Sequence, residues 1–192
     1  MESNSQVNLL EDQIRNSYGR VVWTHKTQEK CADILLRRHN RIKILQIILS
    51  AITTTGVLVA VFGENQTVGI ITAVISAILF GINAYTKGYD LGKEAQKHSS
   101  TATNLWNIRE AYFSLLTDLR SEQNSIEEII VKRDKLQESL SNAYKGAPRT
   151  ISKAYKEATK GLKSNEEMTF SDKEIDLLLP TSLRKNKQDQ KP

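Results

Sequence analysis

Two long stretches without a charged side chain follow each other in this chain and constrain its fold more than any other feature. They run from Ile44 to Gly63 and from Asn65 to Thr86, 20 and 22 residues, with only Glu64 between them. At about 1.5 Å of helical rise per residue, each covers about 30 Å, the thickness of a bilayer's hydrocarbon core. We therefore predict a hairpin of two transmembrane helices, at residues 44–63 and 66–86.

A buried helical hairpin within a soluble bundle is the competing interpretation. Helices that are apolar on all sides need protein around them, and a chain of 192 residues has little left to cover two. The composition, 39% hydrophobic and 26% charged, resembles that of a soluble protein only because charged and amide residues crowd the flanks. We expect the hairpin to span a membrane.

Basic residues lie at one end of the predicted hairpin. They precede the first span and follow the second, whereas the turn at residues 63–66 has none. The positive-inside rule then places both chain termini in the cytoplasm. The residues that set this orientation are Arg37, Arg38, Arg41, Lys43, Lys87, Lys93 and Lys97.

Small residues recur at every fourth position of the second span. This face consists of Gly69, Ala73, Ala77 and Gly81. Small side chains on one face let another helix approach closely. The partner is either the other helix of the hairpin or a second subunit.

Polar residues gather on one side of each span. The second span carries Thr72, Ser76 and Asn83 within about 40°, and the first carries Gln46, Ser50, Thr53 and Thr54 within about 100°. Polar groups are costly in lipid and should turn toward other helices or water. Hydroxyls can bond to their own backbone, so Gln46 and Asn83 are the most informative. The set either packs helices together by hydrogen bonds or lines a pore.

The flanking sequences predict more helices, which makes the fold all-α. Before the hairpin, an apolar pattern from Leu10 to Leu35 is compatible with a helix that runs into the first span, or with a break near Gly19. After the hairpin, ten of twelve heptad positions from Leu105 to Ala143 are apolar or aromatic. This pattern predicts one long, coiled-coil-like helix, interrupted only by Glu122 and Arg133. These two residues either fix the register of a coiled coil or mark a looser seam where the helix packs back on the N-terminal helix.

Shorter elements are expected near the C-terminus. Gly146 and Pro148 should end the long helix, and a short helix should follow with Ile151, Tyr155, Ala158 and Leu162 on one side. Ser171 and Glu174 have capping-box spacing at the start of a last short helix. The predicted regions are 1–43 helical, 44–86 hairpin, 87–146 long helix, 147–180 short helices and 181–192 a disordered basic tail.

No pattern for catalysis, metal or cofactor binding emerges from the residues. Cys31 is the only cysteine, and His25, His39 and His98 are scattered. There is no glycine-rich phosphate loop and no nucleophile elbow. The net charge of +5 comes without the interleaved aromatic residues that stack on bases. We expect a protein that is not an enzyme, needs no cofactor and does not bind nucleic acid directly.

The arrangement resembles the SLATT domains of prokaryotic conflict systems, in which a helix enters a two-helix membrane hairpin and a long helix leaves it. The similar residues run from about Tyr18 to Leu119 and include CADILLRRHNRIKILQIILSAITTTGV, FGENQ, GINAYTKGYDLGKEAQKH and TATNLWNIREAYFSLL. The stretch GAPRTISKAYKEATKG is similar to the C-terminal part of a subgroup associated with reverse transcriptases. These motifs are patterns of residue class.

The resemblance implies an antiviral effector that forms pores in, or otherwise disturbs, the inner membrane when a sensor detects infection. It also implies a sensor enzyme or nucleotide signal encoded nearby, although the sequence has no nucleotide-binding motif. We expect a homo-oligomer in the inner membrane whose cytoplasmic helices assemble the subunits. The alternative is a membrane-anchored scaffold whose coiled coil recruits a cytoplasmic partner.

Overall fold

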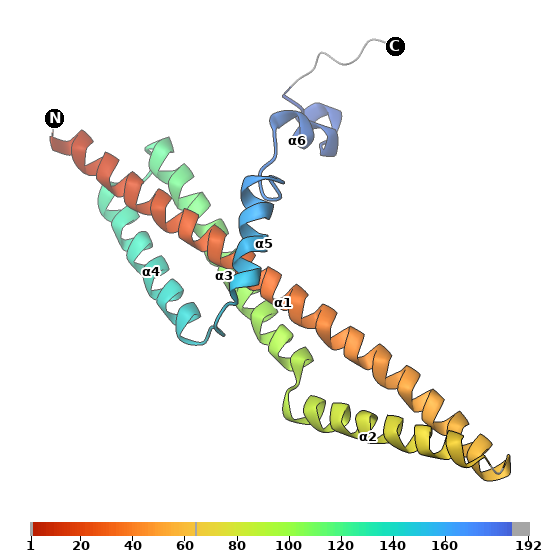
Figure 1. The fold of residues 1–192 in the computed structure, drawn as a ribbon. Helices are drawn as coiled ribbons and strands as arrows, with labels where there is room; N and C mark the ends of the chain where they lie inside the picture. The colour runs from red at the N-terminus through yellow and green to blue at the C-terminus, as the bar shows by residue number, and fades with distance from the viewer. Residues whose placement is uncertain (1, 64, 186–192) are drawn as a thin grey trace, which may run out of the picture.

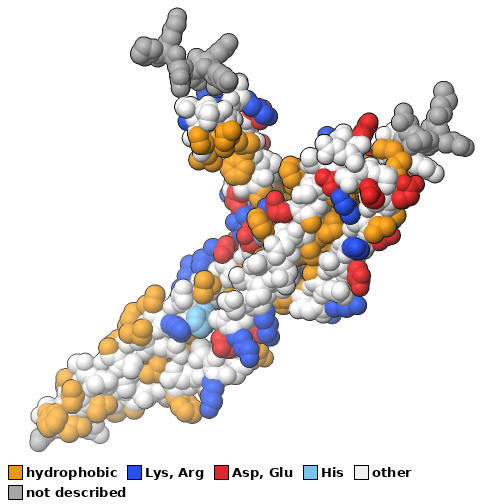
Figure 2. Space-filling view, turned by 180° about the vertical axis from the view of Figure 1, so that it is seen from behind, with side chains coloured by type: hydrophobic (Ala, Val, Ile, Leu, Met, Phe, Trp, Pro, Cys, Tyr) orange, Lys and Arg blue, Asp and Glu red, His pale blue; other side chains and the backbone are white. Residues whose placement is uncertain are grey.

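The computed structural model describes residues 2–63 and 65–185, and these residues form helices joined by short connections (Figure 1). The elements are α1 Glu2–Phe62, α2 Gln66–Gly88, α3 Leu91–Ser121, α4 Ile126–Lys145, α5 Ser152–Lys163, α6 Asp172–Leu178 and a 3₁₀ turn, η1, Thr181–Leu183. The all-α prediction is confirmed. The α1–α2 hairpin projects from one end of a helical bundle that is rich in charged residues (Figures 1 and 2).

Helix α1 is continuous over 61 residues, from the bundle to the tip of the hairpin. The predicted run of helix into the first span is thereby confirmed, and Gly19 does not break it. A Cβ atom added at Gly19 would meet nothing within 4 Å. At 1.5 Å per residue, α1 is a rod about 90 Å long that joins the bundle directly to the hairpin.

Helices α1, α3 and α4 pack side by side around one apolar core (Figure 1). Tyr112, Ile14, Leu105, Ile129 and Val21 are its most deeply buried members. The remaining core residues are Leu10, Ile108, Leu115, Leu119 and Leu140. This core fixes the N-terminal part of α1 against the segment that follows the hairpin.

The prediction of a single long helix over residues 87–146 is wrong. The chain turns back on itself after α3, where Glu122 takes a left-handed conformation with φ of 54°. Ser125 then begins α4 with a capping box, because its side chain accepts from the Glu128 amide while the Glu128 side chain accepts from the Ser125 amide. All ten apolar heptad positions nevertheless lie in or against the core. Leu119 and Ile126 are seven residues apart, so the heptad register continues across the turn and could not reveal it.

The C-terminal elements differ from expectation in their details. Helix α4 ends at Lys145, as Gly146 predicted, and α5 then crosses α1. The buried face of α5 is Ala154, Ala158 and Gly161 rather than the predicted face, of which only Ala158 is buried. Small side chains give a close crossing, and they leave the larger Tyr155 exposed.

The last helix, α6, begins with the predicted capping box between Ser171 and Glu174. The prediction of a disordered tail from residue 181 is wrong for residues 181–183, which form η1. Residues 186–192 of the predicted tail lie outside the described residues.

The α4 capping box generates a first prediction. Ser125→Ala removes one of its two bonds and should lower the free energy of unfolding of the bundle by about 1 kcal/mol. Ser139→Ala is the matched control, since Ser139 lies inside α4 and, among the described residues, its hydroxyl bonds only to the Lys135 carbonyl. Urea denaturation of the full chain in detergent measures both. Equal effects of the two changes would contradict a specific role for the cap.

Candidate functional site: the polar flank of the hairpin

The hairpin helices are apolar on surfaces that the rest of the protein does not cover. Both α1 and the helical region that begins with α2 contain an 18-residue window with the length and composition to cross a membrane. None of the first window and 6% of the second is buried. Figure 2 shows hydrophobic side chains covering this end of the molecule. A core helix of a soluble protein would be mostly buried, so these two helices have the character of membrane spans.

The two spans meet along a seam with alternating steps of three and four residues. Its less exposed members on α1 are Ile42, Gln46, Leu49, Thr53, Gly56 and Ala60, and those on α2 are Val68, Thr72, Ile75, Leu79, Ile82 and Thr86. This spacing is typical of coiled-coil packing. Thr72 is the one buried residue of α2, and its side chain touches the position that a Cβ on Gly56 would take.

The small-residue face does not serve as the hairpin seam. Gly69 approaches α1, because a Cβ added there would lie 3.5 Å from that of Ala60. Ala73, Ala77 and Gly81 are exposed. The prediction that this face packs against the other helix of the hairpin is therefore wrong for three of its four residues. Contact of this face with a second subunit stays a prediction.

The two amides of the spans pair with each other. Gln46 Nε2 donates to Asn83 Oδ1 at 2.7 Å and lies 3.2 Å from Thr86 Oγ1. The Thr86 hydroxyl in turn donates to the Asn83 carbonyl at 3.1 Å. In hydrocarbon an unpaired amide is costly, so this pairing ties α1 to α2 near the basic end of the hairpin.

One flank of the hairpin gathers polar residues from both helices. Gln46, Ser50, Thr54 and Asn83 line a groove together with Ile47, Ala51, Thr55 and Leu79. We call Gln46, Ser50, Thr54 and Asn83 the polar flank. A second groove shares Ala51 and Thr55 with the first, is otherwise lined by Ile52, Gly56, Val68, Ile71, Thr72 and Ile75, and is largely apolar.

The other three predicted polar residues lie elsewhere. Thr72 is buried in the seam and Ser76 is exposed. Thr53 also faces the seam, and its buried hydroxyl has no hydrogen-bond partner among the described residues. The structure thus brings together four of the seven candidates, two of which bond across the hairpin.

The predicted basic residues are exposed around the end of the hairpin that joins the bundle. Arg38 lies 3.5 Å from the Tyr85 hydroxyl, and Arg37 pairs with Glu157 at 3.4 Å. Arg41, Lys43, Lys87, Lys93 and Lys97 complete this set. Tyr85 and Tyr89 stack at the same level with ring centroids 5.4 Å apart. Aromatic and basic side chains are typical of a membrane interface.

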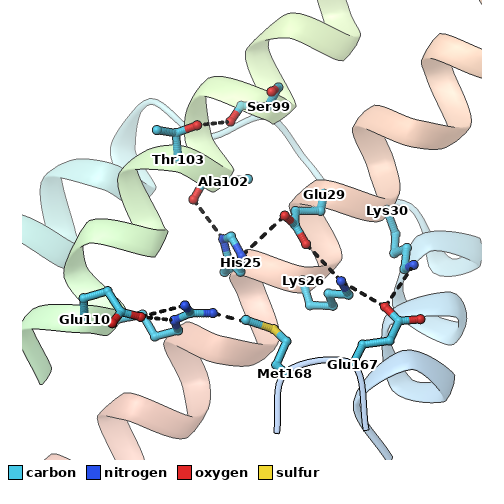
Figure 3. Close-up of polar contacts among 11 residues, drawn as sticks. His25, Lys26, Glu29, Lys30, Ser99, Ala102, Thr103, Glu110, Glu167 and Met168 are labelled. Carbon is cyan, nitrogen blue, oxygen red and sulfur yellow. Dashed lines mark hydrogen bonds and ion pairs between the residues drawn. The ribbon is translucent and has the colours of Figure 1, made fainter. Parts of the chain in front are cut away.

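A cluster of charges that the sequence did not reveal holds the C-terminal segment to α1 (Figure 3). The Glu167 carboxylate lies 3.0 Å from Lys26 Nζ and 3.3 Å from Lys30 Nζ. The Lys26 ammonium above all lowers the pKa of Glu167 to about 2. The neighbouring Met168 sulfur lies 3.8 Å from Arg109 of α3. We call these contacts of Glu167 and Met168 the C-terminal clamp.

Two buried histidines tie α1 to α3 beside this clamp. His25 Nδ1 donates to the Ala102 carbonyl at 2.9 Å, and His98 Nδ1 bonds to the Gln28 amide oxygen. The Gln28 amide nitrogen donates to the Pro148 carbonyl at 3.2 Å, in the connection between α4 and α5. Burial lowers the pKa of His98, which keeps its ring neutral at pH 7.

A cavity of about 520 Å³ opens between α1 and α3 next to His25. Its other polar lining residues are Lys26, Glu29, Asp33, Ser99 and Thr103. Within the described residues no group of His, Cys, Asp and Glu side chains has the arrangement of a metal site. The polar contacts of this region join α1 to α3, to the connection between α4 and α5, and to the segment after α5.

The close contact of Gly56 with Thr72 generates a second prediction. Gly56→Ala forces the two spans apart and should lower hairpin stability by about 1–3 kcal/mol, the usual range for overpacking. Gly56→Ala/Thr72→Ala removes the obstacle and should recover most of the loss. Thermal unfolding in detergent of the two single variants and the double variant measures the coupling. Simple additivity would contradict direct contact.

The C-terminal clamp generates a third prediction. Glu167→Gln should increase hydrogen exchange in residues 164–170, because it removes the negative charge between Lys26 and Lys30. The pKa of the Glu167 carboxyl is about 2, against the ordinary 4.5. Its contribution to the stability of the clamp is therefore complete above pH 4.5 and is lost as pH falls toward 2. The difference between wild type and variant should shrink over that range. Glu166→Gln is the matched control, and an equal effect there would contradict the clamp.

Comparison with known proteins assigns the chain to a family. Neither curated proteins nor solved structures gave a match. The model of SMODS and SLOG-associating 2TM effector domain family 4 matches residues 10–174, which include the hairpin, the bundle and α5. The resemblance to SLATT domains is confirmed, and the association with reverse transcriptases stays a prediction. Together with the two exposed apolar helices, this match shows a membrane protein that belongs to the SMODS and SLOG-associating 2TM effector domain family 4.

Proposed function

We propose that this membrane effector assembles as a homo-oligomer in the inner membrane of a prokaryotic cell and permeabilises that membrane on activation. Growth arrest or cell death would follow as the defensive outcome. The observation that carries the proposal is the polar flank, since side chains from both spans converge on a single side of the hairpin. Family membership supports the role of membrane effector in conflict systems.

The polar flank is unfavourable in lipid. Gln46 and Asn83 satisfy part of their hydrogen bonding with each other, and Thr54 donates to the Ser50 carbonyl at 2.9 Å. The hydrogen-bond donors and acceptors that these bonds leave unused still require water or another polar helix. One hairpin cannot enclose a water path, whereas several hairpins with this flank turned inward can. The exposed Ala73, Ala77 and Gly81 would allow neighbouring hairpins to approach closely.

The basic end of the hairpin supports an orientation with both termini in the cytoplasm. Arg41, Lys43, Lys87 and Lys93 are exposed at that end, and the described part of the opposite turn carries no basic residue. The bundle, α5 and α6 then face the cytoplasm. A trigger could reach them there without crossing the membrane.

Activation would act through the cytoplasmic helices. A nucleotide or a sensor enzyme encoded nearby is the proposed trigger, and it needs only to bind one state of the assembly better than another. Because α1 continues unbroken from the bundle core to the hairpin tip, a shift of α1 within the bundle would reach the hairpin. The bundle surface is also the proposed site of contact between subunits.

The fourth prediction tests the polar flank without breaking the Gln46–Asn83 pair. Ser50→Leu/Thr54→Leu should abolish depolarisation when the protein is induced, because it makes the groove apolar. Thr67→Leu, a similar change near the turn and outside this groove, should depolarise like wild type. A voltage-sensitive dye measures membrane potential in cells with equal membrane abundance of each form.

The outcomes separate the pore from the alternative of a scaffold anchored in the membrane. If Ser50→Leu/Thr54→Leu depolarises cells as much as the wild type does, the polar flank is not needed for permeabilisation. If the wild type preserves the membrane potential even when neighbouring genes are supplied and the cells die, the permeabilising role is wrong. Exchange of the hairpin for an unrelated anchor would then be expected to preserve activity.

A further inference from the structure

The outward side of α5 carries a row of lysines with no acidic partner. Lys153, Lys156, Lys160 and Lys163 follow one another in steps of three and four, so they share one side of the helix. All four are exposed. Among the described residues, the first three have no ion pair, and Lys163 lies over the Trp23 ring at 5.4 Å from its centroid. We call these four residues the basic row.

Some surface lysines on other helices pair with acidic residues. Lys97 pairs with Glu94 at 2.6 Å, and Lys132 pairs with Asp118 at 2.8 Å. Pairs of opposite charge such as Glu94 and Lys97 are usual on a solvated helix face. The only acidic residue of α5 is Glu157, and it is engaged with Arg37. The basic row therefore presents uncompensated positive charge.

Contacts with α1 define which side of α5 is turned toward the hairpin. Glu157 reaches Arg37, which lies seven residues, or about 10 Å, before the start of the first span at Ile44. Tyr155, on the opposite side of α5, contacts Trp23 with ring centroids 5.9 Å apart. Trp23 is about 30 Å from Lys43 along the helix. The Glu157 side of α5 is thus its membrane-proximal side.

Lys153 and Lys160 of the basic row lie next to this membrane-proximal side, whereas Lys163 contacts Trp23 on the distal side. Lys153 precedes Glu157 by four residues and Lys160 follows it by three, which places all three on one face. The headgroup layer extends about 5–8 Å beyond the hydrocarbon core, and lysine side chains extend further from the helix. With charges effective over about 8 Å in physiological salt, the row lies within electrostatic range of the membrane surface.

We propose that the basic row binds anionic lipid headgroups of the same bilayer that holds the hairpin. Each lysine near an anionic leaflet gains favourable interaction, and several in a row add their contributions. A nucleic-acid backbone is the less favoured polyanion, because the row faces the bilayer and Tyr155 lies on the opposite side of α5. Bound headgroups would hold α5 parallel to the membrane surface. Because the C-terminal clamp joins the segment after α5 to α1, they would also restrict the movement of α1. This inference needs membrane insertion but not pore formation.

The fifth prediction measures the distance between α5 and the headgroups in the full chain. A fluorophore is attached at Ser152→Cys, an exposed position on α5, while the buried Cys31 resists labelling because burial raises the pKa of its thiol. The protein is reconstituted in vesicles of phosphatidylcholine alone or mixed with phosphatidylglycerol. Each contains a trace of lipid with a quencher on its headgroup. Quenching should be stronger in the mixed vesicles, and high salt should remove the difference.

Matched variants link the effect to the basic row. Lys153→Gln/Lys156→Gln/Lys160→Gln should lose the phosphatidylglycerol-dependent quenching. Lys135→Gln/Lys145→Gln/Lys173→Gln, exposed lysines outside the row with the same change in charge, should retain it. Equal quenching in the two kinds of vesicle, or equal loss in both variants, would overturn the proposal. So would row-dependent binding of a short DNA duplex without any lipid preference.

Discussion

The unbroken backbone hydrogen bonding of α1 is the constraint on which the other elements depend. Helices α2, α3 and α5 pack mainly on α1 at different heights, and α4 completes the bundle between α1 and α3. Residues 42–60 of this one helix form the hairpin seam, Lys26 and Lys30 hold the C-terminal clamp, and Ile14 and Val21 lie in the bundle core. A helix cannot bend sharply without losing such bonds or introducing proline or a bulge. An unbroken α1 would therefore transmit a shift within the bundle to the hairpin.

Within the membrane, the cost of polar groups organises the hairpin. The Gln46–Asn83 bond joins the spans, whereas Ser50 and Thr54 remain on the groove next to it. The second, largely apolar groove offers lipid mainly isoleucine, valine and alanine. A hairpin with two unlike sides suits an assembly whose subunits expose one side to lipid and turn the other toward each other or toward water. The membrane-proximal lysines of α5 would add a second, electrostatic attachment at the surface.

The spans and the basic end of the hairpin were readable from the sequence because length, charge and composition each carry direct physical meaning. The pattern of core residues after the hairpin was also readable, but the turn at Glu122 was not, since Leu119 and Ile126 keep the heptad register through it. The prediction for the face of α5 failed because close crossing favours Ala154 and Gly161 over the larger residues. The C-terminal clamp joins Lys26 to Glu167 across most of the chain, and no periodic pattern encodes such a contact.

Access of water to the polar flank tests the central claim most directly. Thr54→Cys and Ile52→Cys place one thiol on the polar flank and one in the largely apolar groove that Ile52 lines, at nearly the same depth. In reconstituted vesicles, a charged, water-soluble thiol reagent should modify position 54 much faster than position 52, and the modification should reduce ion flux. Equal or slower reaction at position 54 would contradict a water path along the polar flank.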